Sequence, residues 1–87
     1  MKKMKRSDIE DYAKQSGENL ILIDGHDDAI IGICQKFNSV SVLYDKNKII
    51  KKLAKHMDYD DALEYFDFNI VGAYLGDETP TFLINEN

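Results

Sequence analysis

The sequence predicts a small α/β domain, in which a three-stranded sheet packs against about four helices. Residues 20–23 form a continuous apolar run, residues 39–44 alternate and are rich in β-branched residues, and residues 81–84 form a short closing segment. All three have the length of strands, and apolar residues at helical spacing lie between them. The composition, 44% hydrophobic and 31% charged, is typical of a folded globular chain. The expected order is helix, strand, helix, strand, helix, helix, strand. We expect residues 1–87 to form one domain that begins with a flexible basic arm at residues 1–6.

The first half of the chain predicts two parallel strands joined by a helix. Before them, Ser7 and Glu10 have the spacing of a capping box, and Gly17 is suited to end the first helix. A buried strand is expected at residues 20–23, followed by a second helix that Asp24 caps. A strand, a helix and a further strand in this order predict a right-handed crossover between parallel strands. The buried stripe of the second helix would comprise Ala29, Ile30, Ile33, Cys34 and Phe37.

The second half predicts two further helices and a closing strand. Asp45 can cap the third helix, at residues 46–56, and the fourth helix is expected from Asp58 to about Leu75. Pro80 would fix the entry of the chain into the last strand. The outer face of the third helix is basic, and we interpret it as a solvated surface, with phosphate or an acidic partner as the alternative. It carries Lys48, Lys51, Lys52 and Lys55.

The fourth helix has more apolar residues than a single buried stripe can accommodate. Its second face therefore predicts either a central core helix or an interface, with a homo-oligomer or with another protein. The tyrosines could anchor such an interface, and the glycine would allow close approach of a second backbone. The candidate interface residues are Tyr65, Phe68, Asn69, Gly72 and Tyr74.

The most polar cluster follows the first expected strand and consists of Asp24, His26, Asp27 and Asp28. Carboxylates at the carboxyl end of a strand could bind a small molecule, a nucleotide or a divalent cation. The favoured interpretation is structural, because aspartates at a helix start cap exposed amides and complement the helix dipole. We therefore assign no metal site from the sequence.

Charge and motifs exclude several classes of function. The net charge of −5 disfavours nucleic acid and anionic membranes as partners, and no apolar run approaches the roughly 20 residues of a membrane span. A single cysteine, Cys34, precludes an intrachain disulfide and suits a cytoplasmic protein. Cys34, His26 and His56 have no evident catalytic partners. The sequence thus predicts a non-enzymatic protein without a cofactor, although metal-dependent hydrolysis is left open.

The segment from Leu20 to Phe82 resembles a family of small bacteriophage and prophage proteins of uncharacterised function. The shared pattern is an Asp-Asp-Ala helix start, a Tyr-Asp turn, a Glu-Tyr-Phe-x-Phe-Asn core and a Gly-x-x-Thr-Pro close. The residues at these places are Asp27, Asp28, Ala29, Tyr44, Asp45, Glu64, Tyr65, Phe66, Phe68, Asn69, Gly76, Thr79 and Pro80. The resemblance implies a phage origin, expression in bacterial cytoplasm and no particular activity.

Two hypotheses for function follow. The first is a phage accessory protein that binds and blocks a host or defence protein, which suits the small size and the surplus apolar face of the fourth helix. The second is an oligomer that sequesters a nucleotide, a metal or another small molecule at the aspartate cluster or near Asn69.

Overall fold

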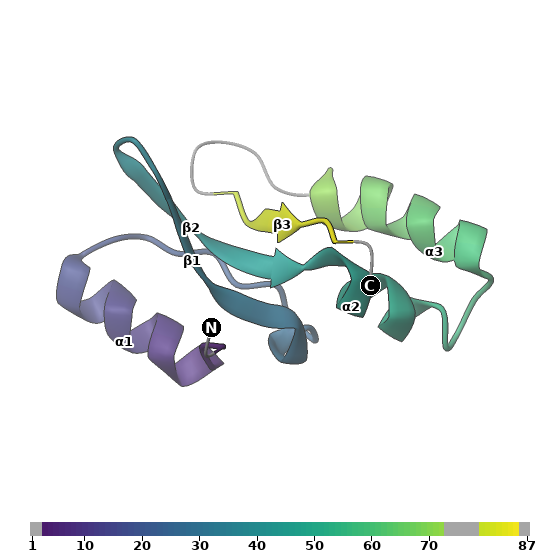
Figure 1. The fold of residues 1–87 in the computed structure, drawn as a ribbon, viewed down its shortest axis with the longest axis horizontal. Helices are drawn as coiled ribbons and strands as arrows, with labels where there is room; N and C mark the ends of the chain where they lie inside the picture. The colour runs from purple at the N-terminus through teal and green to yellow at the C-terminus, as the bar shows by residue number, and fades with distance from the viewer. Residues whose placement is uncertain (1–2, 73–78, 86–87) are drawn as a thin grey trace.

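The computed structural model describes residues 3–72 and 79–85 of the chain. These residues form three α-helices and a three-stranded sheet, so the predicted α/β class is confirmed (Figure 1). A 3₁₀ turn precedes the first strand, and a π-helical segment continues the last helix. In chain order the elements are α1 (Arg6–Ser16), η1 (Asp27–Ala29), β1 (Ile30–Lys36), β2 (Ser39–Asp45), α2 (Lys46–Leu53), α3 (Tyr59–Tyr65), η2 (Phe66–Val71) and β3 (Thr81–Leu83).

The sheet is mixed, with the strand order β1-β2-β3. β1 and β2 form an antiparallel hairpin, whereas β3 pairs with β2 in parallel. The prediction of a parallel crossover between the first two strands is therefore wrong. The connection between parallel strands runs instead from β2 to β3, and it contains α2 and α3 (Figure 1). The described residues hold three α-helices rather than about four.

The chain between α1 and β1 differs from the prediction. Residues 20–23 form an extended loop rather than a strand, and the backbone N–H of Ile23 donates to the Tyr44 hydroxyl at 2.7 Å. The expected helix after Asp24 is replaced by η1 and β1. Of its supposed buried stripe, Ile30, Ile33 and Cys34 lie in β1, where β-branched side chains lose little freedom and pack well on a sheet. Ala29 lies in η1, and the expected burial of Phe37 is wrong, because this residue lies at the turn after β1 and is 90% exposed.

The hairpin turn at Phe37 and Asn38 could not be predicted from the sequence, for a physical reason. A two-residue hairpin loop that follows the twist of its strands needs positive φ, which is usually supplied by Asn-Gly or Asp-Gly. Here Phe37 adopts a φ of 49°, in the left-handed region that L-residues with bulky side chains rarely enter. No turn signal therefore separates β1 from β2 in the sequence.

The predicted first helix and its glycine end are confirmed. Gly17 adopts a φ of 75°, and its N–H donates to the carbonyl of Ala13 at 3.0 Å. The start differs from the expected capping box: the helix begins at Arg6, and the N–H of Lys5 donates to Asp8 Oδ2 at 2.9 Å. Within the expected basic arm, Met4 donates its N–H to the Ile31 carbonyl on the outer edge of β1 at 3.0 Å.

The remaining predicted elements are close to their expected places. The Asp45 side chain caps α2 by accepting from the Lys48 N–H at 3.2 Å, and the helix ends at Leu53, one turn earlier than expected. α3 follows Asp58 as predicted. The end of the fourth helix near Leu75 lies outside the described residues.

One face of the sheet forms the core with all three helices. The ring of Phe66 meets that of Phe82 edge-on, with centroids 4.9 Å apart, and Phe82 is 6.2 Å from Tyr44. The Lys46 ammonium lies 5.2 Å from the Phe66 centroid, within cation–π range. α1 lies next to β1, whereas α2 and α3 lie together at the other end of the molecule (Figure 1). The largest fully buried side chains are Tyr44, Phe66, Ile9, Ile30, Ile49 and Val42.

Tyr44→Phe is expected to lower the free energy of unfolding by about 1–3 kcal/mol, because the buried N–H of Ile23 loses its acceptor. Urea denaturation measures this change. Tyr12→Phe, at an exposed position of α1, is the control and should change stability by less than about 0.5 kcal/mol. Equal stabilities of Tyr44→Phe and the wild type would contradict the assigned hydrogen bond.

Candidate functional site

The predicted interface residues lie on α3 and η2. Tyr65 is 43% exposed and Phe68 is 73% exposed, and Asn69 and Gly72 are exposed beside them. Tyr74 lies outside the described residues. The structure therefore brings four of the five predicted residues to the surface of one helical segment.

The helix divides its apolar residues between two faces. Ala62, Phe66 and Ile70 recur every four residues and are all buried against the sheet and α2. η2 has the wide turn of a π-helix, which the Gly72 N–H closes by donating to the Asp67 carbonyl at 3.1 Å. Such turns are often found at functional sites. A second set of residues, spaced by three and four, faces away from the core: Asp61, Glu64, Tyr65, Phe68 and Asn69.

These outward residues surround a shallow, open depression of about 430 Å³. We call it the α3 depression, and its lining comprises Met57, Asp61, Glu64, Tyr65, Phe68 and Asn69. Two carboxylates thus lie beside two aromatic rings, an arrangement suited to a cationic side chain. Reasoning from the sequence missed Met57, Asp61 and Glu64 as members of this site, although the spacing of Asp61 and Glu64 from Tyr65 and Phe68 is a signal that could have indicated them.

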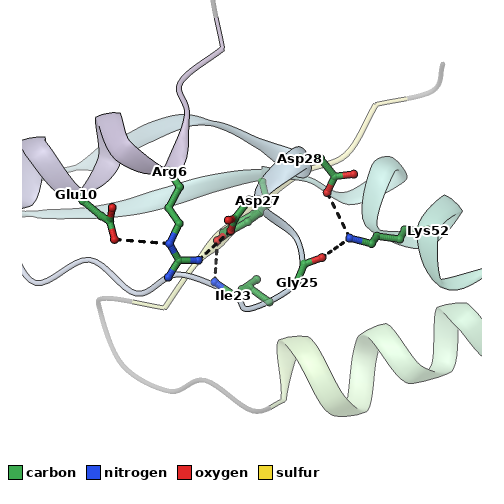
Figure 2. Close-up of polar contacts among 8 residues, drawn as sticks. Arg6, Glu10, Ile23, Gly25, Asp27, Asp28 and Lys52 are labelled. Atoms are coloured by element: carbon green, nitrogen blue, oxygen red, sulfur yellow. Dashed lines mark hydrogen bonds and ion pairs between the residues drawn. The ribbon is translucent and has the colours of Figure 1, made fainter.

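The aspartate cluster lies in the loop between α1 and β1, where cations from two helices hold it (Figure 2). Arg6 of α1 donates from Nη1 to Asp27 Oδ1 at 3.0 Å, and its Nε lies 3.6 Å from Glu10 Oε2. The contact with Asp27 raises the pKa of Arg6, which therefore stays charged. The loop is thus tied to α1 by an ion pair.

The other side of the loop is tied to α2. Lys52 Nζ lies 3.7 Å from Asp28 Oδ1 and also donates to the Gly25 carbonyl (Figure 2). Lys48 Nζ donates to the Asp28 carbonyl at 3.2 Å. Two lysines of the basic face of α2 therefore hold this loop. That face is thus not the purely solvated surface that the sequence indicates.

The same geometry bears on ligand binding by the cluster. Asp27 and Asp28 each already have a cationic partner, and Asp24 is exposed at the turn before them. Within residues 3–72 and 79–85, no three His, Cys, Asp or Glu side chains lie together in a way that could hold a metal ion. The aspartates thus have a structural role, but not the predicted one: η1 rather than an α-helix follows Asp24, no side chain in the described part of the chain caps η1, and Asp27 and Asp28 hold the loop between α1 and α2 through ion pairs.

His26 lies inside this loop. Its Nδ1 is buried and has no hydrogen-bond partner among the described residues. Burial is the largest cause that lowers the pKa of His26, and the charge of Lys52 lowers it further. The charges of Asp28 and Asp27 raise this pKa, but by less. The folded protein therefore favours neutral His26.

Comparison of the chain with protein-family models, with curated proteins and with solved structures finds no match. Across the described part of the chain, no helix is both long enough and apolar enough to cross a membrane.

His26→Gln is expected to reduce the loss of stability on acidification. Because the pKa of His26 is lower in the folded than in the unfolded chain, the unfolded state binds the extra proton as the pH falls below about 6.5. The stability conferred by neutral His26 is thus present above that pH and is lost below it. Unfolding at about pH 7.5 and about pH 5.5 should show a smaller difference for the variant than for the wild type.

The control for this experiment is His56→Gln, at an exposed position after α2, which should keep the wild-type difference. Equal differences in wild type and His26→Gln would contradict the assigned environment of His26.

Phe66→Ala and Phe68→Ala form a matched pair, two residues apart in η2. We expect Phe66→Ala to lower the free energy of unfolding by about 3–5 kcal/mol, because it leaves a cavity beneath Phe82. Phe68→Ala should change it by less than about 0.5 kcal/mol, because that ring is exposed. Chemical denaturation distinguishes the two, and comparable losses would show that Phe68 is also in the core.

Proposed function

We propose that this chain is a non-enzymatic binding protein whose α3 depression docks onto a basic surface of another protein. The resemblance to phage proteins adds the partner's origin: a host or defence protein in the bacterial cytoplasm, which the chain would block by occupying its surface. The observation that carries the proposal is the pairing of exposed aromatic rings with carboxylates on one face of α3 and η2.

The exposed aromatic residues support the proposal, because burying them against a partner would contribute free energy that the free protein does not gain. Burying a phenylalanine side chain contributes about 1.5–3 kcal/mol, which Phe68 forgoes in the free protein. Tyrosine and phenylalanine at the centre of an interface supply large contact areas, and tyrosine is enriched among residues that dominate binding energy. Tyr65 and Phe68 are one helical turn apart and line the same depression.

The charges indicate which kind of partner suits this face. Asp61 and Glu64 line the depression, and Asp60 and Asp67 lie exposed on the same helical segment. Two copies that met through α3 about a two-fold axis would bring these carboxylates together, and such repulsion disfavours a homodimer. A partner with arginine or lysine around an apolar centre would instead form charge-assisted hydrogen bonds and cation–π contacts.

The packing of α3 and η2 on the sheet also favours binding. The core contacts of Phe66 and Ile70 fix the helix on the sheet, so its outer face is presented without further ordering. A preorganised face loses less conformational entropy on binding than a mobile one. No catalytic set of side chains is needed for this function.

Four variants test the proposal by capture of proteins from bacterial lysate. Phe68→Ala and Glu64→Lys remove the aromatic and the acidic part of the face, whereas Tyr12→Ala and Glu18→Lys make similar changes at exposed positions elsewhere. We expect a partner that wild type and both controls retain and that both α3 variants lose by about tenfold or more. Its binding should also weaken as salt is raised, because ion pairs at the rim are screened.

Light scattering completes this test, with a monomer as the expected result. A dimer that Phe68→Ala dissociates would assign the face to a second copy and contradict a foreign partner. Captured proteins that all four variants bind equally would also contradict the proposal.

A further inference from the structure

A second hollow lies on the sheet beside the β1–β2 hairpin, apart from the α3 depression. Its volume is about 560 Å³, within the usual range for small-molecule sites. We call it the hairpin hollow. Its lining includes Lys36, Phe37, Asn38, Ser39, Ser41 and Thr81.

The strand register places the polar groups of this hollow on one face. Cys34 lies opposite Ser41, and Lys36 lies opposite Ser39, so these four side chains project to the same side of the hairpin. Ser41 Oγ meets Thr81 Oγ1 of β3 at 2.6 Å. β2 therefore has an apolar face in the core and a face of small polar side chains that line the hollow.

The chemistry of the lining indicates an anionic ligand. The Ser39 hydroxyl already donates to the Lys36 carbonyl at 3.1 Å, and one hydroxyl of the Ser41 and Thr81 pair donates to the other. The second hydroxyl of that pair, the Asn38 amide and the Lys36 ammonium can donate hydrogen bonds to a ligand oxygen. Lys36 supplies one positive charge, and no carboxylate belongs to the described lining, although the whole chain has a net charge of −5. Phosphate oxygens, which accept several hydrogen bonds and carry negative charge, suit these donors.

Phe37 adds a flat apolar surface at the rim. Its side chain is 90% exposed, and its φ of 49° is strained for a residue with a large side chain. Stability alone would favour asparagine or glycine at this turn. Strain of this kind persists at functional sites, and an exposed phenylalanine ring can stack on a planar ligand group.

We propose that the hairpin hollow binds a phosphorylated small molecule that carries a planar ring, of the nucleotide type. The Lys36 ammonium meets the phosphate, the Phe37 ring stacks on the planar group, and hydroxyls of the Ser41 and Thr81 pair face the part between them. This site is separate from the α3 depression, so it can be present or absent whatever the outcome of the partner experiments.

The test is a titration of ¹⁵N-labelled protein with adenosine monophosphate, followed by amide chemical shifts. We expect the shifts to gather at residues 34–41 and 79–81. Adenosine lacks the phosphate and inorganic phosphate lacks the ring. Each should therefore bind at least about tenfold more weakly than adenosine monophosphate.

Lys36→Gln should weaken adenosine monophosphate binding by about tenfold, whereas Lys14→Gln, an exposed lysine of α1, should leave it unchanged. Phe37→Asn should raise the melting temperature by relieving the strained turn, and should weaken binding at the same time. Absence of shifts at residues 34–41 would overturn the proposal. Binding that neither Lys36→Gln nor Phe37→Asn weakens would overturn it as well.

Discussion

The edge-on contact between the rings of Phe66 and Phe82, at 4.9 Å, fixes the helical segment of α3 and η2 on the sheet. Phe82 lies on β3, which pairs with β2 in the sheet, and Phe66 lies at the start of η2. Lys46 of α2 adds its charge near the Phe66 ring. Because this contact anchors α3 through one face, the opposite face is left outside the core and available for the docking that we propose.

Two groups of charged side chains have different roles. The cations Arg6 and Lys52 form surface ion pairs with Asp27 and Asp28 and so hold the loop around them. The carboxylates of α3, by contrast, lie exposed beside Tyr65 and Phe68. The aspartate cluster, which looks more like a binding site in the sequence, is thus explained by its ion pairs. The exposed aromatic and acidic face of α3 and η2 is not explained by packing within the protein.

The parts that could be predicted from the sequence were those governed by local physics. The Gly17 end, the Asp45 cap and the surplus apolar face of the fourth helix depend on neighbouring residues alone. Residues 29–37 could not be assigned, because their apolar spacing fits a helix as well as a strand and Phe37 conceals the turn. Because that turn could not be predicted, the hairpin hollow could not be predicted either, since its lining depends on the β1–β2 register.

The central claim, that the helical segment of α3 and η2 has one buried and one exposed aromatic face, can be tested on the four phenylalanine rings of the free protein. NMR spectra of ring-labelled phenylalanine, recorded with a soluble paramagnetic agent, report the access of solvent to each ring. The account predicts strong broadening of Phe68 and Phe37 and protection of Phe66. Protection of Phe68, or broadening of Phe66 equal to that of Phe68, would contradict it.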